Sequence, residues 1–207
     1  MENGCSWQRE IAFKCEFGVW PFRKTLEITP NGFVWCGELV PMRKITKLRW
    51  GVDQKRGGIL PRRTFIAVFG TKTRDFIIKT KQKDFYEHLT DKYWVSVGKR
   101  ILSEMLSRVK NGGAYDFGDF YVSDGGVTVK GRTFLCGGAR EEFYAFEDLN
   151  WGIVNGSLCF THRLKPDKVL AGASFLWVDN VCILNVALGL MSRVHGKKLS
   201  CAAACDV

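Results

Sequence analysis

The feature that most constrains this chain is an internal repeat. Three blocks recur in the same order: 28–33 (ITPNGF) as 122–127 (VSDGGV), 45–52 (ITKLRWGV) as 146–153 (FEDLNWGI), and 93–106 as 175–188. The copies lie about 82 to 101 residues apart, which is longer than the periods of most solenoid repeats. The sequence therefore predicts two homologous domains rather than an array of short repeats.

The length of the chain agrees with this division. Its 207 residues give two units of about 100 residues, and each is large enough to bury a core of its own. We expect a first domain over residues 1–112, a second over 113–196 and a flexible tail over 197–207.

Both units begin with strand-like alternation and end with a helical pattern. The expected strands of the first unit are 10–17, 22–29, 33–36, 43–51, 64–69 and 75–79. Those of the second are 117–122, 127–130, 143–152, 157–161 and 173–177. Residues 53–62 are expected to form a long hairpin loop, because two glycines and a proline interrupt any regular pattern there.

The helical patterns have apolar residues three and four positions apart. One runs over 93–109 with Asp91 as the expected N-cap and ends at Asn111-Gly112-Gly113. The other begins at about Asn180, capped by Asp179 or Asn180, and ends near Gly196. Each unit is thus predicted to be a mainly β structure of antiparallel strands followed by one amphipathic helix.

The positive charge of the chain is concentrated in its first half. Residues 1–110 contain 22 Lys and Arg against 11 Asp and Glu, whereas the remainder contains 9 against 10, which together give the net charge of +10. One copy of the repeat is therefore strongly basic and the other nearly neutral. An anionic partner such as a membrane surface, a nucleic acid or an acidic protein is expected to meet the first copy.

Cysteine and histidine usage favours a reduced, cytoplasmic protein without a metal. The eight cysteines form no CxxC pair, and none of the three histidines lies near a cysteine in the sequence. No stretch has the pattern of a signal peptide or the length of a membrane span. We expect no cofactor and no metal site.

The blocks 45–51 (ITKLRWG), 93–107 with its WVSVGKR segment, and 178–181 (VDNV) resemble those of bacterial tandem proteins with the pleckstrin-homology-like (PH-like) fold. The resemblance covers nearly the whole chain. It implies an α+β fold in which each unit is a bent, partly open antiparallel barrel capped by its C-terminal helix. Since the shared motifs concern packing and helix capping, the resemblance brings no catalytic residue with it.

In membrane-binding relatives of that fold, basic residues at the open end of the barrel hold lipid phosphates. The residues that the resemblance and the charge pattern suggest here are Lys14, Arg23, Lys24, Lys55, Arg56, Arg62 and Arg63. The match is partial, because Thr25 stands where the usual pattern has an arginine. The alternative interpretation is a solvated hairpin whose cations only aid solubility.

No arrangement of nucleophile, base and carboxylate is recognisable, so we do not expect an enzyme. The sequence favours a non-catalytic protein-interaction or scaffold module, in which a peptide adds to a sheet edge or docks against the terminal helix. The alternative is a peripheral membrane or other anion-binding module that uses the basic loop of the first domain, with nucleic acid a weaker candidate. The oligomeric state is left open.

Overall fold

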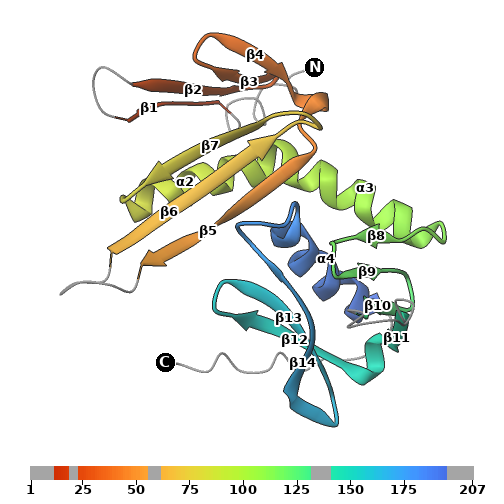
Figure 1. Cartoon of the computed structure of the whole chain (residues 1–207). Coiled ribbons are helices and arrows are strands. Elements are labelled where there is room, and N and C mark those ends of the chain that lie inside the picture. The colour runs from red at the N-terminus through yellow and green to blue at the C-terminus, as the bar shows by residue number, and fades with distance from the viewer. Residues whose placement is uncertain (1–11, 19–22, 56–61, 132–140, 195–207) are drawn as a thin grey trace. The chain divides into compact units, whose positions relative to one another are not determined.

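The computed structural model describes residues 12–18, 23–55, 62–131 and 141–194 (Figure 1). The chain forms two compact units that divide between Ile101 and Leu102. This division lies inside helix α3 (Lys99–Lys110), whereas the boundary expected from the sequence follows the helix, at residue 112. The helix that closes the first unit therefore continues without a break into the second.

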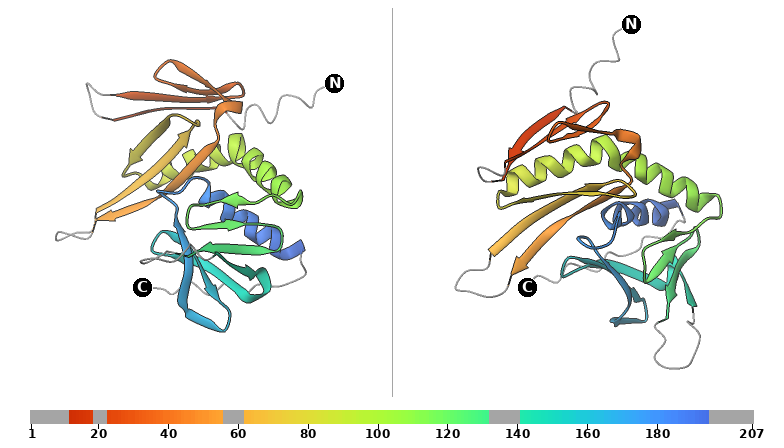
Figure 2. Two further views of the ribbon diagram at one scale, coloured as in Figure 1. Left: turned by 45° about the vertical axis from the view of Figure 1, so that its right-hand side comes forward. Right: turned by 45° about the horizontal axis from the view of Figure 1, so that its top comes forward.

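The first unit consists of two antiparallel sheets and a long helical segment. Its four-stranded sheet has the order β1 (Phe13–Phe17), β2 (Lys24–Thr29), β3 (Gly32–Trp35), β4 (Glu38–Pro41). After the 3-10 turn η1 (Met42–Lys44), its three-stranded sheet has the order β5 (Lys47–Lys55), β6 (Arg62–Gly70), β7 (Asp75–Thr80). Helix α2 (Lys83–Tyr93), a π-helical turn η2 (Trp94–Gly98) and α3 follow directly on one another. Figure 2 shows these elements from two further directions.

The second unit repeats the plan. The chain forms β8 (Tyr115–Asp116), β9 (Phe120–Val122), β10 (Gly126–Lys130) and β11 (Glu141–Ala145), then the 3-10 turn η3 (Phe146–Asp148). The second sheet consists of β12 (Leu149–Val154), β13 (Ser157–His162) and β14 (Lys165–Ser174), and α4 (Val181–Val194) closes the unit. The mainly β, α+β class expected from the sequence is thus confirmed, with one four-stranded and one three-stranded sheet among the described residues of each unit.

The repeated sequence blocks occupy equivalent hairpins. Ile28 pairs with Phe33 across the β2–β3 turn, and the aligned residues Val122 and Val127 pair across the β9–β10 turn. The glycines that open β3 and β10 have the same surroundings. A Cβ on Gly32 would lie 2.2 Å from the Val40 carbonyl oxygen, and one on Gly126 would lie 2.1 Å from that of Tyr144. The duplication therefore extends to the backbone contacts of the two sheets.

An aromatic cluster joins the two sheets of the first unit to the helix. The Phe33 ring on β3 packs edge-on against Phe69 of β6 at 4.6 Å and stacks on Tyr93 of α2 at 5.3 Å. Phe69 in turn stacks on Phe76 of β7, with ring centroids 4.6 Å apart. Phe33, Phe69 and Tyr93 are completely buried. The core of the unit is therefore where the sheets and α2 meet.

Several expected element boundaries were wrong. Asp91 does not cap a helix, because α2 begins at Lys83 and Asp91 lies within it. The expected loop over 53–62 is shorter, because Lys55 pairs with Arg62 and only the intervening residues, which lie outside the described part, remain to connect the strands. The expected helix stop was correct, since α3 ends at Lys110 and Gly112 has a φ of +78°.

Two further differences concern the strands. β4 was missed because its four residues follow β3 after a two-residue turn, with Cys36 at φ 49° and Gly37 at φ 87°. Such a turn requires positive φ at both positions, and a cysteine is not a usual signal for it. The continuous strand expected over 143–152 is divided by η3 into β11 and β12. The 3-10 turn η1 likewise delays the start of β5 to Lys47.

Candidate functional site

A groove of about 500 Å³ opens on the surface of the first unit, between β4, η1 and the turn that joins β6 to β7. The side chains that give it its character are Glu38, Leu39, Arg43, Lys44, Lys72 and Arg74. The groove thus combines one carboxylate and one exposed apolar side chain with four cations.

The cations come from two separate segments. Arg43 and Lys44 are exposed residues of η1, and Lys72 is an exposed residue of the β6–β7 turn. Within the described part of the chain, no ion-pair partner is found for any of these three. Arg74 is partly neutralised, since its guanidinium donates to Glu38 at 2.7 Å and lies 4.5 Å from the centre of the Phe76 ring. The groove therefore keeps a positive surplus that suits an anionic ligand.

Hydrogen bonds fix both segments. The Thr71 hydroxyl accepts from the N–H groups of Thr73 at 3.3 Å and Arg74 at 3.2 Å, and the Thr71 N–H donates to the Arg74 carbonyl at 2.8 Å. On the other side, the Arg100 guanidinium donates to the carbonyl oxygens of Met42, at 3.3 Å, and Ile45. Arg100 of α3 therefore anchors the turn η1.

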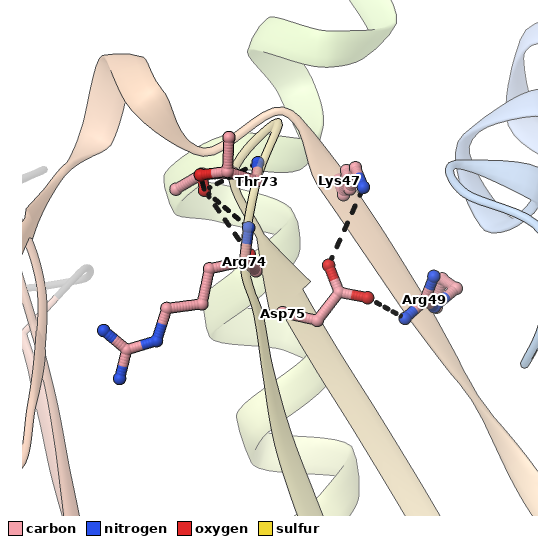
Figure 3. Close-up of polar contacts among 6 residues, drawn as sticks. Lys47, Arg49, Thr73, Arg74 and Asp75 are labelled. Atoms are coloured by element: carbon pink, nitrogen blue, oxygen red, sulfur yellow. Dashed lines mark hydrogen bonds and ion pairs between the residues drawn. The ribbon is translucent and has the colours of Figure 1, made fainter.

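Figure 3 shows two further cations, Lys47 and Arg49, on the other side of the β6–β7 turn from the Arg74 side chain. Lys47 and Arg49 of β5 bind the Asp75 carboxylate, at 3.8 Å and 2.5 Å respectively. The Arg74 side chain leaves the turn on the opposite side from them (Figure 3). Asp75 thus separates the cations of β5 from those of the groove.

The groove also contains an open strand edge. β4 pairs with β3, and among the described residues no strand pairs with its other side. In an antiparallel pair, successive residues direct their backbone groups alternately toward the partner and away from it. Met42 donates to the Asn31 carbonyl at 3.1 Å, which fixes this alternation. The N–H and C=O of Leu39 consequently point to the open side of β4.

The structure distributes the predicted binding residues over two places. Lys14 on β1 lies 3.6 Å from Glu27, and Arg23, just before β2, lies 3.8 Å from Glu16. The Lys24 ammonium lies 5.6 Å from the centre of the Trp35 ring. These three cations are thus exposed residues of the four-stranded sheet, each beside a partner of that sheet.

The other predicted residues belong to the far end of the β5–β6 hairpin. Arg63 is an exposed residue of β6 opposite Gln54. Lys55 and Arg62 are a backbone pair whose side chains are outside the described part, and Arg56 lies outside the described residues altogether. The groove adjoins the opposite end of these nine-residue strands, about 26 Å away at the usual rise per residue. This hairpin end and the groove are therefore distinct basic regions.

Sequence reasoning missed the four cations of the groove. Two of them follow β4 and two belong to the Thr71–Arg74 turn, so they form two short pairs about 30 residues apart. Such pairs usually belong to solvated turns, and only the packing of the two sheets brings these together. The available signal was weak, because it consisted of two basic residues in each of two short turns.

Other site types find no support in the described residues. No group of three His, Cys, Asp or Glu side chains gathers there in a way that could hold a metal ion. Burial raises the pKa of the Cys15 thiol to about 11, which opposes its use as a thiolate near neutral pH. None of the helices described is long and apolar enough to cross a membrane.

Comparison with known proteins gives no identification. No protein family, no curated protein and no solved structure matches this chain.

Proposed function

We propose that the chain is a non-catalytic protein-interaction module made of two PH-like units, and that its first unit binds an extended acidic peptide along β4. The observation that carries the proposal is the coincidence of an open strand edge with a surplus of cations in one groove. Backbone pairing supplies a binding mode, and the cations select for acidic sequences.

Each part of the groove has a role in this proposal. The Leu39 N–H and C=O pair with the peptide backbone, and the exposed Leu39 side chain contacts an apolar residue of the peptide. Carboxylates of the peptide interact with Arg43 and Lys44 on one side and with Lys72 on the other. Pro41 has no N–H to offer on the open side, which restricts pairing to a short peptide segment.

The PH-like assignment of the two units is supported by their order of elements. Each has a four-stranded antiparallel meander, a three-stranded meander and then a helix. The helix packs across both sheets in the first unit, where Tyr93 contacts Phe33 and Phe69. The packing of a helix on two sheets supports the resemblance, although the described strands form separate sheets and no closed barrel.

The test uses a fluorescein-labelled octapeptide of alternating Glu and Val, with fluorescence anisotropy as the readout. We expect saturable binding that weakens with salt, since exposed ion pairs are screened. The double variant Arg43→Glu/Lys72→Glu is expected to bind about tenfold more weakly, because it removes two attractive charges and adds two repulsive ones. An octapeptide of alternating Lys and Val should not bind.

The matched control is Lys14→Glu/Arg23→Glu, which makes the same change in net charge on β1 and before β2. It is expected to bind the acidic peptide as the unchanged protein does. Equal losses in the two variants would mean that only the overall charge matters and would contradict a site in the groove. Binding of phosphatidylserine vesicles that is lost on reversing Lys55, Arg56, Arg62 and Arg63, with no binding of the peptide, would favour the membrane-binding alternative instead.

A further inference from the structure

We infer that the acidic strand bound in the groove is β11 of a second copy of this chain. The inference rests on the proposed function, since it identifies the partner of the same groove. The two copies of the repeat have an open strand edge at the same place, β4 in the first unit and β11 in the second, and the two edges differ in charge.

β4 and β11 occupy the same place in their units. Gly32 and Gly126 are aligned in the repeat, and they pair with Pro41 and Ala145 respectively. Counting back from these pairs makes Leu39 the equivalent of Phe143. Both are exposed large apolar side chains, with 52% and 56% of their surface accessible.

β11 is also an open edge. It pairs with β10, and no strand among the described residues pairs with its other side. The Phe146 N–H donates to the Gly125 carbonyl at 3.2 Å, as the Met42 N–H does to Asn31 in the first unit. The same alternation therefore directs the N–H and C=O of Phe143 outward. Unlike Pro41, Ala145 keeps an N–H for pairing.

The two edges have opposite charge. Glu141 and Glu142 on β11 and Glu147 and Asp148 on η3 are all exposed. Lys130 lies opposite Glu141 on the neighbouring strand β10. Its ammonium group, however, donates to both carboxylate oxygens of Asp116, each at 2.8 Å. The acidic edge of one copy thus matches the basic groove of another in charge, in apolar contact and in unpaired backbone groups.

In the described part of each chain, the basic edge β4 and the acidic edge β11 are different surfaces, so the contact is heterologous. The β4 edge of one copy receives β11 of the next, whose own β4 edge remains open. The expected result is head-to-tail association that grows with protein concentration and closes only if the geometry allows a ring. Pro41 and the shortness of the two strands limit each contact, which favours reversible assembly.

The experiment is sedimentation velocity of the full chain at low and high salt over about a hundredfold range of concentration. We expect the mean sedimentation coefficient to rise with concentration at low salt and to rise less at high salt. Two variants, Glu141→Lys/Glu142→Lys and Arg43→Glu/Lys72→Glu, should each remain monomeric. An equimolar mixture of the two should associate again, because each variant then meets a complementary edge on the other.

The control variant Glu87→Lys/Asp167→Lys makes the same charge change as the β11 variant at exposed residues of α2 and β14. It should associate as the unchanged chain does. Association unaffected by the β11 changes, or a monomer at every concentration, would overturn the inference.

If the Glu/Val peptide binds while the chain stays monomeric, the inference fails and the proposed function stands. If the charge-swapped mixture associates but the peptide does not bind, recognition is restricted to the chain's own strand and general acidic-peptide binding fails.

Discussion

Replacing Gly32 or Gly126 with alanine is expected to lower the free energy of unfolding by about 3 kcal/mol or more at each position. The added Cβ would lie 2.2 Å from the Val40 carbonyl oxygen in the first case and 2.1 Å from the Tyr144 carbonyl oxygen in the second. These oxygens are backbone atoms of the next strand, so no rotamer change relieves the overlap. The two strands, β3 and β4 or β10 and β11, must therefore separate, which weakens their backbone hydrogen bonds as well as their packing.

The measurement is chemical denaturation followed by circular dichroism. Gly152→Ala is the matched control, because Gly152 is also a strand glycine but its added Cβ would meet nothing within 4 Å. That variant should keep nearly the stability of the unchanged protein. If Gly32→Ala and Gly152→Ala cost the same, the close approach of β4 to β3 is not what requires a glycine at position 32.

Truncating Tyr93 to alanine is expected to cost about 3 to 5 kcal/mol of stability, because it leaves a large cavity where α2 meets both sheets. Removing only the hydroxyl, in Tyr93→Phe, should leave stability unchanged or raise it by about 1 kcal/mol. The hydroxyl is fully buried and has no hydrogen-bond partner among the described residues. Its burial, with a smaller contribution from Cys15, also raises the pKa of Tyr93 well above its ordinary value.

The same denaturation experiment distinguishes the ring from the hydroxyl. A large loss in Tyr93→Phe would contradict this account, since it would mean that the oxygen makes a stabilising interaction. A small loss in Tyr93→Ala would mean that the aromatic cluster can collapse around the cavity.

The fold was predictable where periodicity and the repeat reinforced each other. The block 28–33 and its copy 122–127 fall on equivalent hairpins, and the last helix begins close to the expected residue, at Val181. The strand β4 escaped prediction because Cys36 is not a usual signal for the two-residue turn that leads into it. The full length of α2 was harder to predict, because Leu89 and Tyr93 are its buried residues and its first turns are polar.

For the candidate site, the sequence indicated only a positive charge and a place in the first unit. The charge imbalance between the halves favours the first unit, and the groove belongs to that unit. Its location depends on contacts between η1 and the β6–β7 turn, which are distant in sequence. The predicted cations Lys14 and Arg23 instead lie beside glutamates of their own sheet, which periodicity alone does not reveal.

The most direct test of the account is amide hydrogen exchange at Leu39, measured by NMR with and without the Glu/Val octapeptide. We expect the Leu39 amide, which points to the open side of β4, to exchange at least about tenfold more slowly when the peptide is saturating. Protection that appears elsewhere in the first unit while Leu39 is unchanged would contradict strand addition to β4.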